Sequence, residues 1–194
     1  MTHDLDQRVH FAIDLARGAG ELGLKYFRDL DNLTIESKGH QDLVSDGDRE
    51  VELFIRAAIA AAYPQDGIVG EEHASVAGTT GYVWVIDPID GTANFVRGIP
   101  AWCVVIACAR DGETVVGVIH EPSTGETFHG RRGAPGRWQS ARAGRDHGSR
   151  EGSWLRNAPA LSRRTCQAKA NPQAACDSDL CASARISNDR TRAA

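Results

Sequence analysis

The apolar patterning of this 194-residue chain stops near residue 131, and this limits the part that can form a hydrophobic core. Beyond that point the only branched aliphatic residues are Leu155, Leu161, Leu180 and Ile186, and Val, Phe and Tyr do not occur. The charge divides at the same place: 9 basic and 21 acidic residues precede it and 13 basic and 5 acidic residues follow, making up the totals of 22 and 26. A segment so poor in apolar residues cannot offset the entropy lost on folding. We therefore expect a folded subdomain over residues 1–130 and an atypical, disordered basic tail over residues 131–194.

Within the first 130 residues, the spacing of apolar residues predicts two helices and several short strands. Apolar residues recur at helical spacing from Leu5 to Arg28. A second helix is expected from Ser45, which has an acid three residues later, to Ala62, just before Pro64. Strands are expected at 34–38, 67–69, 82–86, 104–109, 114–120 and 126–129, with a polar turn at 39–42 and the Asp-Gly pair at 111–112 closing a hairpin. The predicted fold class is α+β, with two helices on a largely antiparallel sheet.

Several classes of protein are disfavoured by composition. The chain has no run of about 18 apolar residues, and its first ten residues are mostly polar and contain no apolar run, so we expect no membrane span, no secretory signal and a cytoplasmic location. Five cysteines at irregular positions do not make a disulfide framework, and Cys166, Cys176 and Cys181 lack the paired spacing of a zinc site. The basic tail has no aromatic interleaving, so a nucleic-acid partner is not expected.

Residues Gly18 to Gly23 match the G-x-G-x-x-G pattern of dinucleotide-binding loops. That mechanism requires a strand before the glycines and a helix that begins after them. Here the preceding residues already have helical spacing. The glycines are therefore interpreted as small residues that let a helix pack closely.

Acidic residues follow two of the predicted strands. Asp87 and Asp90 lie three residues apart around Pro88, and Glu71 follows a neighbouring strand. Carboxylate oxygens of this kind suit Mg²⁺. Gly91 allows close approach of the backbone, and N–H groups around it, together with the hydroxyl of Thr92, could hold phosphate oxygens. These parts suit the metal-assisted hydrolysis of a phosphate ester, which needs no covalent nucleophile.

The combination of Gly70-Glu71-Glu72, the stretch Trp84 to Phe95 (WVIDPIDGTANF) and Gly98-Ile-Pro100 resembles the signature of the inositol monophosphatase family. The resemblance extends from about Leu5 to Gly133. It implies the N-terminal half of a layered α-β-α-β-α sugar-phosphatase fold and the Mg²⁺-dependent hydrolysis of a small phosphorylated substrate. The implied substrate is myo-inositol monophosphate. Histidinol phosphate is the alternative, because the stretch 100–102 (Pro-Ala-Trp) is similar to that of some histidinol phosphatases in the family.

The resemblance also implies roles for individual residues. Metal binding would fall to Glu71, Asp87, Asp90 and the carbonyl of Ile89. Substrate phosphate would be contacted by Ile89, Asp90, Gly91 and Thr92. Glu71 and Thr92 would orient and deprotonate the attacking water, and Asp48 would support the Thr92 network or a weak metal site. Full-length members are expected to be homodimers.

The sequence departs from the family after residue 131. Family members continue through a second subdomain to a Trp-Asp-x-Ala-Ala motif, whose aspartate completes the metal site. The four tryptophans here are followed by Val85, Cys103, Gln139 and Leu155, so the motif is missing. The change in composition resembles translation in a shifted reading frame. Two further alternatives therefore remain, a catalytically impaired truncated product and a regulatory binding protein.

Overall fold

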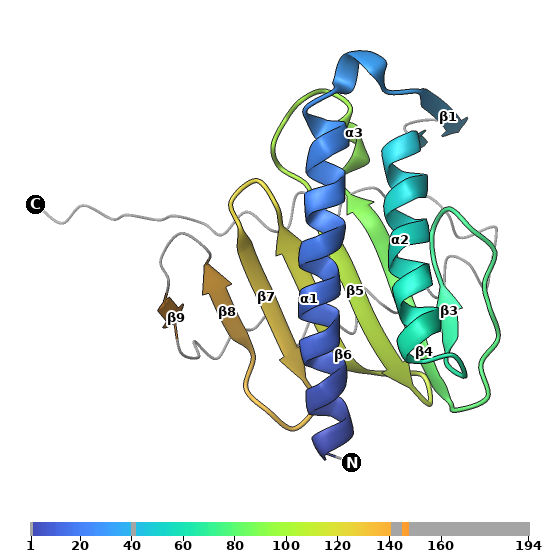
Figure 1. Cartoon of the computed structure of the whole chain (residues 1–194), viewed down its shortest axis with the longest axis vertical. Helices are drawn as coiled ribbons and strands as arrows, with labels where there is room; N and C mark the ends of the chain where they lie inside the picture. The colour runs from blue at the N-terminus through green and yellow to red at the C-terminus, as the bar shows by residue number, and fades with distance from the viewer. Residues whose placement is uncertain (1, 40–41, 141–144, 148–194) are drawn as a thin grey trace, which may run out of the picture.

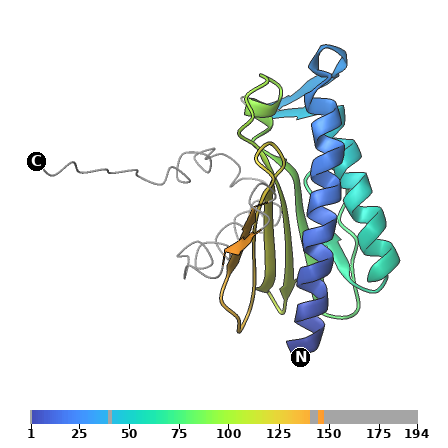
Figure 2. The same ribbon diagram turned by 60° about the vertical axis from the view of Figure 1, so that its left-hand side comes forward.

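The computed structural model describes residues 2–39, 42–140 and 145–147. Two long helices, α1 (Thr2–Phe27) and α2 (Asp46–Ala62), lie side by side on one face of a sheet (Figures 1 and 2). The short elements outside the main sheet are the 3₁₀ helix η1 (Leu30–Asn32), the paired strands β1 (Ile35–Gly39) and β2 (Asp42–Ser45), and the one-turn helix α3 (Thr92–Phe95). The strands of the main sheet are β3 (Gly67–Val69), β4 (Tyr82–Asp90), β5 (Cys103–Arg110), β6 (Glu113–Glu121), β7 (Glu126–Arg131), β8 (Arg137–Ser140) and β9 (Arg145–His147).

The main sheet has its strands in sequence order from β3 to β9. β3 and β4 are parallel, with Val69 opposite Val85, and the other neighbouring pairs in the described part of the sheet are antiparallel. This confirms the predicted α+β class and the largely antiparallel sheet. Strands β8 and β9 lie beyond residue 130, so the described sheet extends past the predicted end of the first subdomain. The division at residue 130 remains a prediction.

The hydrophobic core lies between the two helices and the sheet. The helical residues in it recur every three or four positions, and the strand residues in it alternate, as a buried helix stripe and a buried sheet face require. The fully buried side chains include Ala12, Ala16 and Ala19 of α1, Val51, Ile55 and Ile59 of α2, and Trp84, Ile86, Val104 and Ile106 of the sheet.

The glycines that matched a dinucleotide-binding pattern lie inside α1 and serve helix packing. A Cβ atom added at Gly20 would lie 2.7 Å from Cδ2 of His120, and one added at Gly23 would lie 2.8 Å from Cη2 of Trp102. Both distances are too short for real carbon contacts. The interpretation of these residues as packing glycines is therefore confirmed, and α1 lies close to the sheet because it has no side chains at these two positions.

Strand β4 runs four residues farther than the expected end at Ile86. Its pairing with β5 continues to Asp90, which lies opposite Cys103, and the register shifts between Asp87 and Asp90. Pro88 has no N–H to donate, and a bulge is one of the few places where a sheet accepts proline. The shift in register therefore allows β4 to accommodate Pro88 and still continue to Asp90, where the predicted phosphate loop begins.

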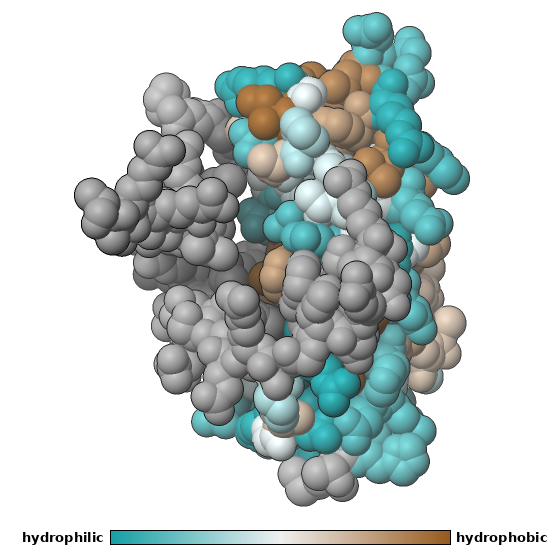
Figure 3. Space-filling model, turned by 90° about the vertical axis from the view of Figure 1, so that its left-hand side faces the viewer, coloured by the Kyte–Doolittle hydropathy of each residue, from teal (hydrophilic) through white to brown (hydrophobic). Residues whose placement is uncertain are grey.

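The end of the molecule that holds η1, β1 and α3 has an apolar surface. Figure 3 shows apolar side chains gathered at this upper end. Ile35 of β1 and Ile99, which follows α3, are exposed by 46% and 45%.

None of the helices in the described part of the chain has the length and the apolar composition that a membrane span requires.

Candidate functional site

The parallel pairing of β3 with β4 brings the predicted acidic residues to one edge of the sheet. Glu71 comes two residues after the end of β3, and Asp87 and Asp90 lie at the end of β4. Because parallel neighbours end at the same edge, the two segments meet there. The side chains of Glu71 and Asp87 are joined by a hydrogen bond. The structure thus brings together two residues that are 16 positions apart in the sequence.

The electrostatic environment of Asp87 is unfavourable for a negative charge. Burial, followed by the charges of Glu71 and Asp90, raises the pKa of the Asp87 carboxyl well above its usual range. In the described structure, its Oδ1 atom is shielded from solvent and has no hydrogen-bond partner. A buried acceptor without a donor is costly, and a bound cation would satisfy it.

Asp90 has a neighbour that the sequence did not suggest. The thiol of Cys103, on the facing strand β5, donates to Oδ2 of Asp90 over 3.6 Å. Burial raises the pKa of Asp90, and this hydrogen bond partly opposes the increase. Cys103 had been considered only for disulfides. Its role depends on the strand pairing of β4 with β5, for which spacing along the chain gives no signal.

Thr92 and Asp48 meet as the resemblance implied. The Thr92 hydroxyl lies 3.1 Å from Oδ1 of Asp48 and 3.0 Å from the carbonyl oxygen of Ile89, and its single proton can be donated to one of them at a time. Oδ2 of Asp48 accepts from the backbone N–H and the hydroxyl of Ser45, which caps α2 in a capping box. Burial is the main reason that the pKa of Asp48 is raised.

Gly91 provides the turn between β4 and α3. Its φ of 99° lies in the left-handed region that favours glycine, and an added Cβ would lie 3.0 Å from the carbonyl oxygen of Ala101. The first N–H groups of a helical turn have no partner within the helix, so those at Gly91 and Thr92 are suited to hydrogen-bond an anion.

The donor set fits a hard divalent cation in its chemistry, since it consists of carboxylate and carbonyl oxygens with one unpartnered buried oxygen on Asp87. Even so, in the part of the chain that the structure describes, no group of three or more His, Cys, Asp or Glu side chains is arranged to hold a metal ion as it stands. Glu71 is instead hydrogen-bonded to Asp87, and Asp90 to Cys103. The assignment of Glu71, Asp87 and Asp90 as metal ligands therefore remains a prediction.

Two further acidic residues lie near the predicted ones. Glu72 is half-buried, and its charge contributes to the raised pKa of Asp48. Glu52 of α2 is fully buried and accepts hydrogen bonds from the backbone of the loop that contains Glu71. The signal for Glu52 was an acid on the apolar face of a predicted helix.

The chain is similar to known proteins in sequence. The pattern of the inositol monophosphatase family matches residues 4–187, which extends farther than the resemblance recognised over Leu5 to Gly133. The histidinol-phosphatase of Chlorobaculum parvum is 40% identical over 134 residues, covering 69% of this chain and 50% of the relative. The inositol-1-monophosphatase of Rhizobium meliloti is 40% identical over 116 residues, covering 59% and 44%.

A solved structure has the same fold over the matched part. The extragenic suppressor protein suhB from Bartonella henselae superposes with a TM-score of 0.66 and 33% sequence identity, covering 67% of this chain and 51% of the other. The chain spans about half the length of the curated relatives that it matches. The family pattern, the identities and the shared fold show that the chain belongs to the inositol monophosphatase family.

Proposed function

We propose that this protein hydrolyses phosphomonoesters in a Mg²⁺-dependent reaction and that its substrate is myo-inositol monophosphate. The observation that supports this most directly is the placement of Asp87, whose unpartnered oxygen lies in an acidic site beside the Thr92–Asp48 pair. The 40% identity to an inositol-1-monophosphatase supports the choice of substrate.

In this proposal Glu71, Asp87, Asp90 and the carbonyl of Ile89 hold Mg²⁺. When bound there, the ion would supply positive charge that stabilises the leaving oxygen and would make the attacking water easier to deprotonate. Glu71 accepts the proton of the attacking water, because its carboxyl group lies beside Asp87 at that edge of the sheet.

Thr92 orients that water in the same proposal. When the Thr92 hydroxyl donates to Oδ1 of Asp48, its lone pairs face away from the proton and can accept from a water molecule. Asp48 is kept in place by its two hydrogen bonds from Ser45. The N–H groups of Gly91 and Thr92 would hold the substrate phosphate, next to Ile89 and Asp90.

Histidinol phosphate is the second candidate substrate, because one relative with 40% identity is a histidinol-phosphatase. The local resemblance at residues 100–102 supports it less than the sequence suggested. Trp102 is 3% exposed and packs against Phe95, with ring centroids 4.9 Å apart. Its ring therefore contributes to the core and is not available to select a substrate.

A phosphate-release assay tests the proposal. Purified protein is incubated with myo-inositol monophosphate or histidinol phosphate, with Mg²⁺ or with a chelator. We expect release that requires Mg²⁺ and is faster with the inositol ester. Thr92→Val, which removes the hydroxyl, should lower the rate at least about tenfold, whereas Thr79→Val, at an exposed position, should not.

Release that is equal with chelator present would contradict the Mg²⁺ dependence. No release above background under any condition would favour the impaired product or the regulatory binding protein. A pull-down with a full-length relative as control would then separate those two, and sedimentation of the same sample would test for a homodimer.

The cytoplasmic location is likewise a proposal, which fractionation of cells would test.

A further inference from the structure

The carboxylate of Glu52 is attached to the loop that follows β3 by three backbone hydrogen bonds. Oε2 accepts from the N–H groups of Glu71, at 2.8 Å, and Glu72, at 2.6 Å. Oε1 accepts from the N–H group of His73, at 3.2 Å. Glu52 is 0% exposed, so these donors replace the water that a buried carboxylate loses.

Arg56 connects the same carboxylate to the far side of the loop. It lies one helical turn after Glu52 on α2, and its Nε donates to Oε1 over 2.7 Å. Its Nη2 donates to the carbonyl oxygen of His73 over 3.0 Å. The helix therefore binds both the N–H side and the carbonyl side of the loop through two side chains.

Gly70 allows this close approach. A Cβ atom at residue 70 would lie 1.9 Å from Oε1 of Glu52 and 2.8 Å from Nη2 of Arg56. Any side chain there would push the loop away from α2. The contact with Glu52, which lies 18 residues earlier in the chain, thus explains why the Gly-Glu-Glu sequence begins with glycine.

We propose that Glu52, held in place by Arg56, is a positioning residue of the candidate site: it fixes the backbone at residues 71–73 so that the side chain of Glu71 reaches Asp87. This inference rests on the proposed function, because it gives Glu71 a task in metal binding. It goes beyond that function in assigning Glu52, Arg56 and Gly70 to the same machinery. The bond between Glu71 and Asp87 is the contact that this positioning produces.

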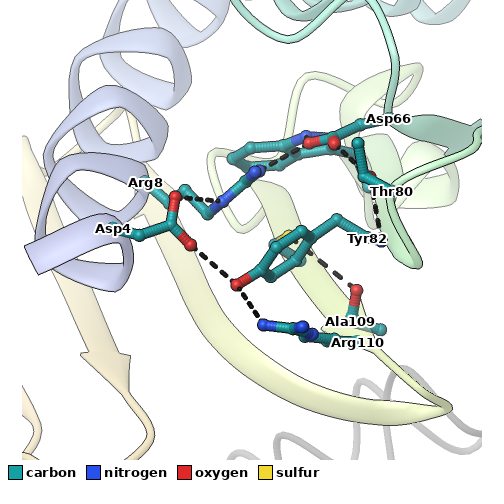
Figure 4. Close-up of polar contacts among 9 residues, drawn as sticks. Asp4, Arg8, Asp66, Thr80, Tyr82, Ala109 and Arg110 are labelled. Atoms are coloured by element: carbon teal, nitrogen blue, oxygen red, sulfur yellow. Dashed lines mark hydrogen bonds and ion pairs between the residues drawn. The ribbon is translucent and has the colours of Figure 1, made fainter. Parts of the chain in front are cut away.

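If Glu52 only stabilised the fold, its replacement would act in the same way as the replacement of another buried carboxylate. The chain offers Asp66 as a matched control for this possibility. Asp66 is also a buried carboxylate, 4% exposed, that accepts from an arginine on a helix (Figure 4). Oδ2 accepts from Arg8 and from the indole of Trp84, and Oδ1 accepts from Thr80. Asp66 precedes β3, whereas the loop that Glu52 binds follows β3. The carboxylates of Asp66 and Glu52 therefore act at opposite ends of one strand.

The experiment compares Glu52→Gln and Asp66→Asn with the unaltered chain by two measurements. Amide hydrogen exchange without metal reports on the N–H groups of residues 71–73. Isothermal titration with Mg²⁺ reports on the site. Each variant keeps the shape of its side chain and loses the charge. We expect Glu52→Gln to speed exchange at 71–73 at least about tenfold and to weaken Mg²⁺ binding between about 10-fold and 100-fold.

Asp66→Asn should lower thermal stability and leave both readouts near those of the unaltered chain. Arg56→Lys, which keeps the charge but loses the forked geometry, should give a smaller change in the same direction as Glu52→Gln. It also serves as the test if circular dichroism shows that Glu52→Gln does not fold.

Unchanged exchange at 71–73 in the folded Glu52 or Arg56 variant would overturn the inference. Equal loss of Mg²⁺ affinity in Asp66→Asn would also overturn it, because the effect would then follow from stability alone. If the unaltered chain binds no Mg²⁺ while Glu52→Gln still speeds exchange, the positioning of the loop stands and the proposed function fails.

Discussion

The carboxylate of Asp87 lies beside two other acids, Glu71 and Asp90, and its Oδ1 atom has no hydrogen-bond partner among the described residues. Because burial and these charges raise its pKa, ionisation of Asp87 is unfavourable in the folded, metal-free protein. Sites that bind ligands often keep such unfavourable charges, and the ligand offsets them. Ionisation of this residue therefore has opposite expected effects on the metal-free fold and on metal binding.

Replacement of Asp87 by Asn tests this opposition. We expect Asp87→Asn to weaken Mg²⁺ binding at least about tenfold, equal to ~1.4 kcal/mol, because one anionic ligand is lost. Without metal, the free energy of unfolding should fall less as the pH rises, since the carboxyl whose ionisation is unfavourable is removed. Asp90→Asn should also weaken Mg²⁺ binding. Titration calorimetry and urea unfolding measure the two effects, with Asp111→Asn at an exposed turn as control. Unchanged Mg²⁺ affinity in both site variants would refute the ligand assignment.

His120 couples the packing of α1 to pH. It is 7% exposed, lies under Gly20 of α1, and contacts the carbonyl oxygen of Glu126 and the hydroxyl of Thr127 through Nδ1. Burial lowers the pKa of His120. Between this lowered pKa and the ordinary value of about 6.5, the unfolded chain therefore binds a proton that the folded protein does not. The contribution of neutral His120 to stability is complete above about pH 6.5 and is lost as the pH falls below it.

We predict that His120→Asn reduces the loss of stability between pH 7.5 and pH 5. The comparison is the difference in free energy of unfolding between these two pH values, measured by urea denaturation. The exposed His10→Asn variant is the control. An equal difference in His120→Asn and in the unaltered protein would show that another group causes the pH dependence.

At the scale of elements, α2 organises the candidate site from two of its turns. Its first turn holds Asp48, which meets Thr92, and its second turn holds Glu52, which binds the loop of Glu71. α1 contributes in another way, by lying close enough to the sheet to bury Trp102 against Gly23. The site thus depends on the placement of both helices on one face of the sheet.

Substitution of Gly23 by Ala separates packing from helix propensity. Propensity alone would make Gly23→Ala stabilising by about 1 kcal/mol. We expect destabilisation by about 1–3 kcal/mol, because the new Cβ would lie 2.8 Å from a buried indole ring. Chemical denaturation gives the values, with Gly117→Ala, where an added Cβ meets nothing within 4 Å, as control. A more stable Gly23→Ala protein would show that α1 can shift without cost.

At the scale of the whole molecule, the chain corresponds to only part of the length of its relatives. The comparisons cover about half of each relative, and the sequence contains no Trp-Asp-x-Ala-Ala motif. By the resemblance, that motif supplies a further metal ligand and neighbouring residues that orient the substrate.

We predict that this chain hydrolyses inositol monophosphate about a hundredfold to a thousandfold more slowly than a chimera in which a relative's second half replaces the residues after Gly130. Lost orientation and weaker metal occupancy together would raise the barrier by about 3–4 kcal/mol. Both proteins are assayed at high Mg²⁺ concentration, with the Asp87→Asn form of the chimera as a control for contaminating phosphatase. Equal turnover in the chain and the chimera would show that the second half is not required here.

The fold class, the family and the segment of the candidate site could all be predicted from the order of the residues alone. Helical and alternating periodicities predict elements reliably because they describe how one element faces the core, and the residues from Trp84 to Phe95 are adjacent in the chain. The tertiary structure decided which distant residues meet. The parallel pairing of β3 with β4 brings Glu71 to Asp87, the pairing of β4 with β5 brings Cys103 to Asp90, and the approach of α2 brings Glu52 to the loop after β3. These contacts depend on strand order and helix placement, which result from packing across the whole core and leave no local spacing in the sequence.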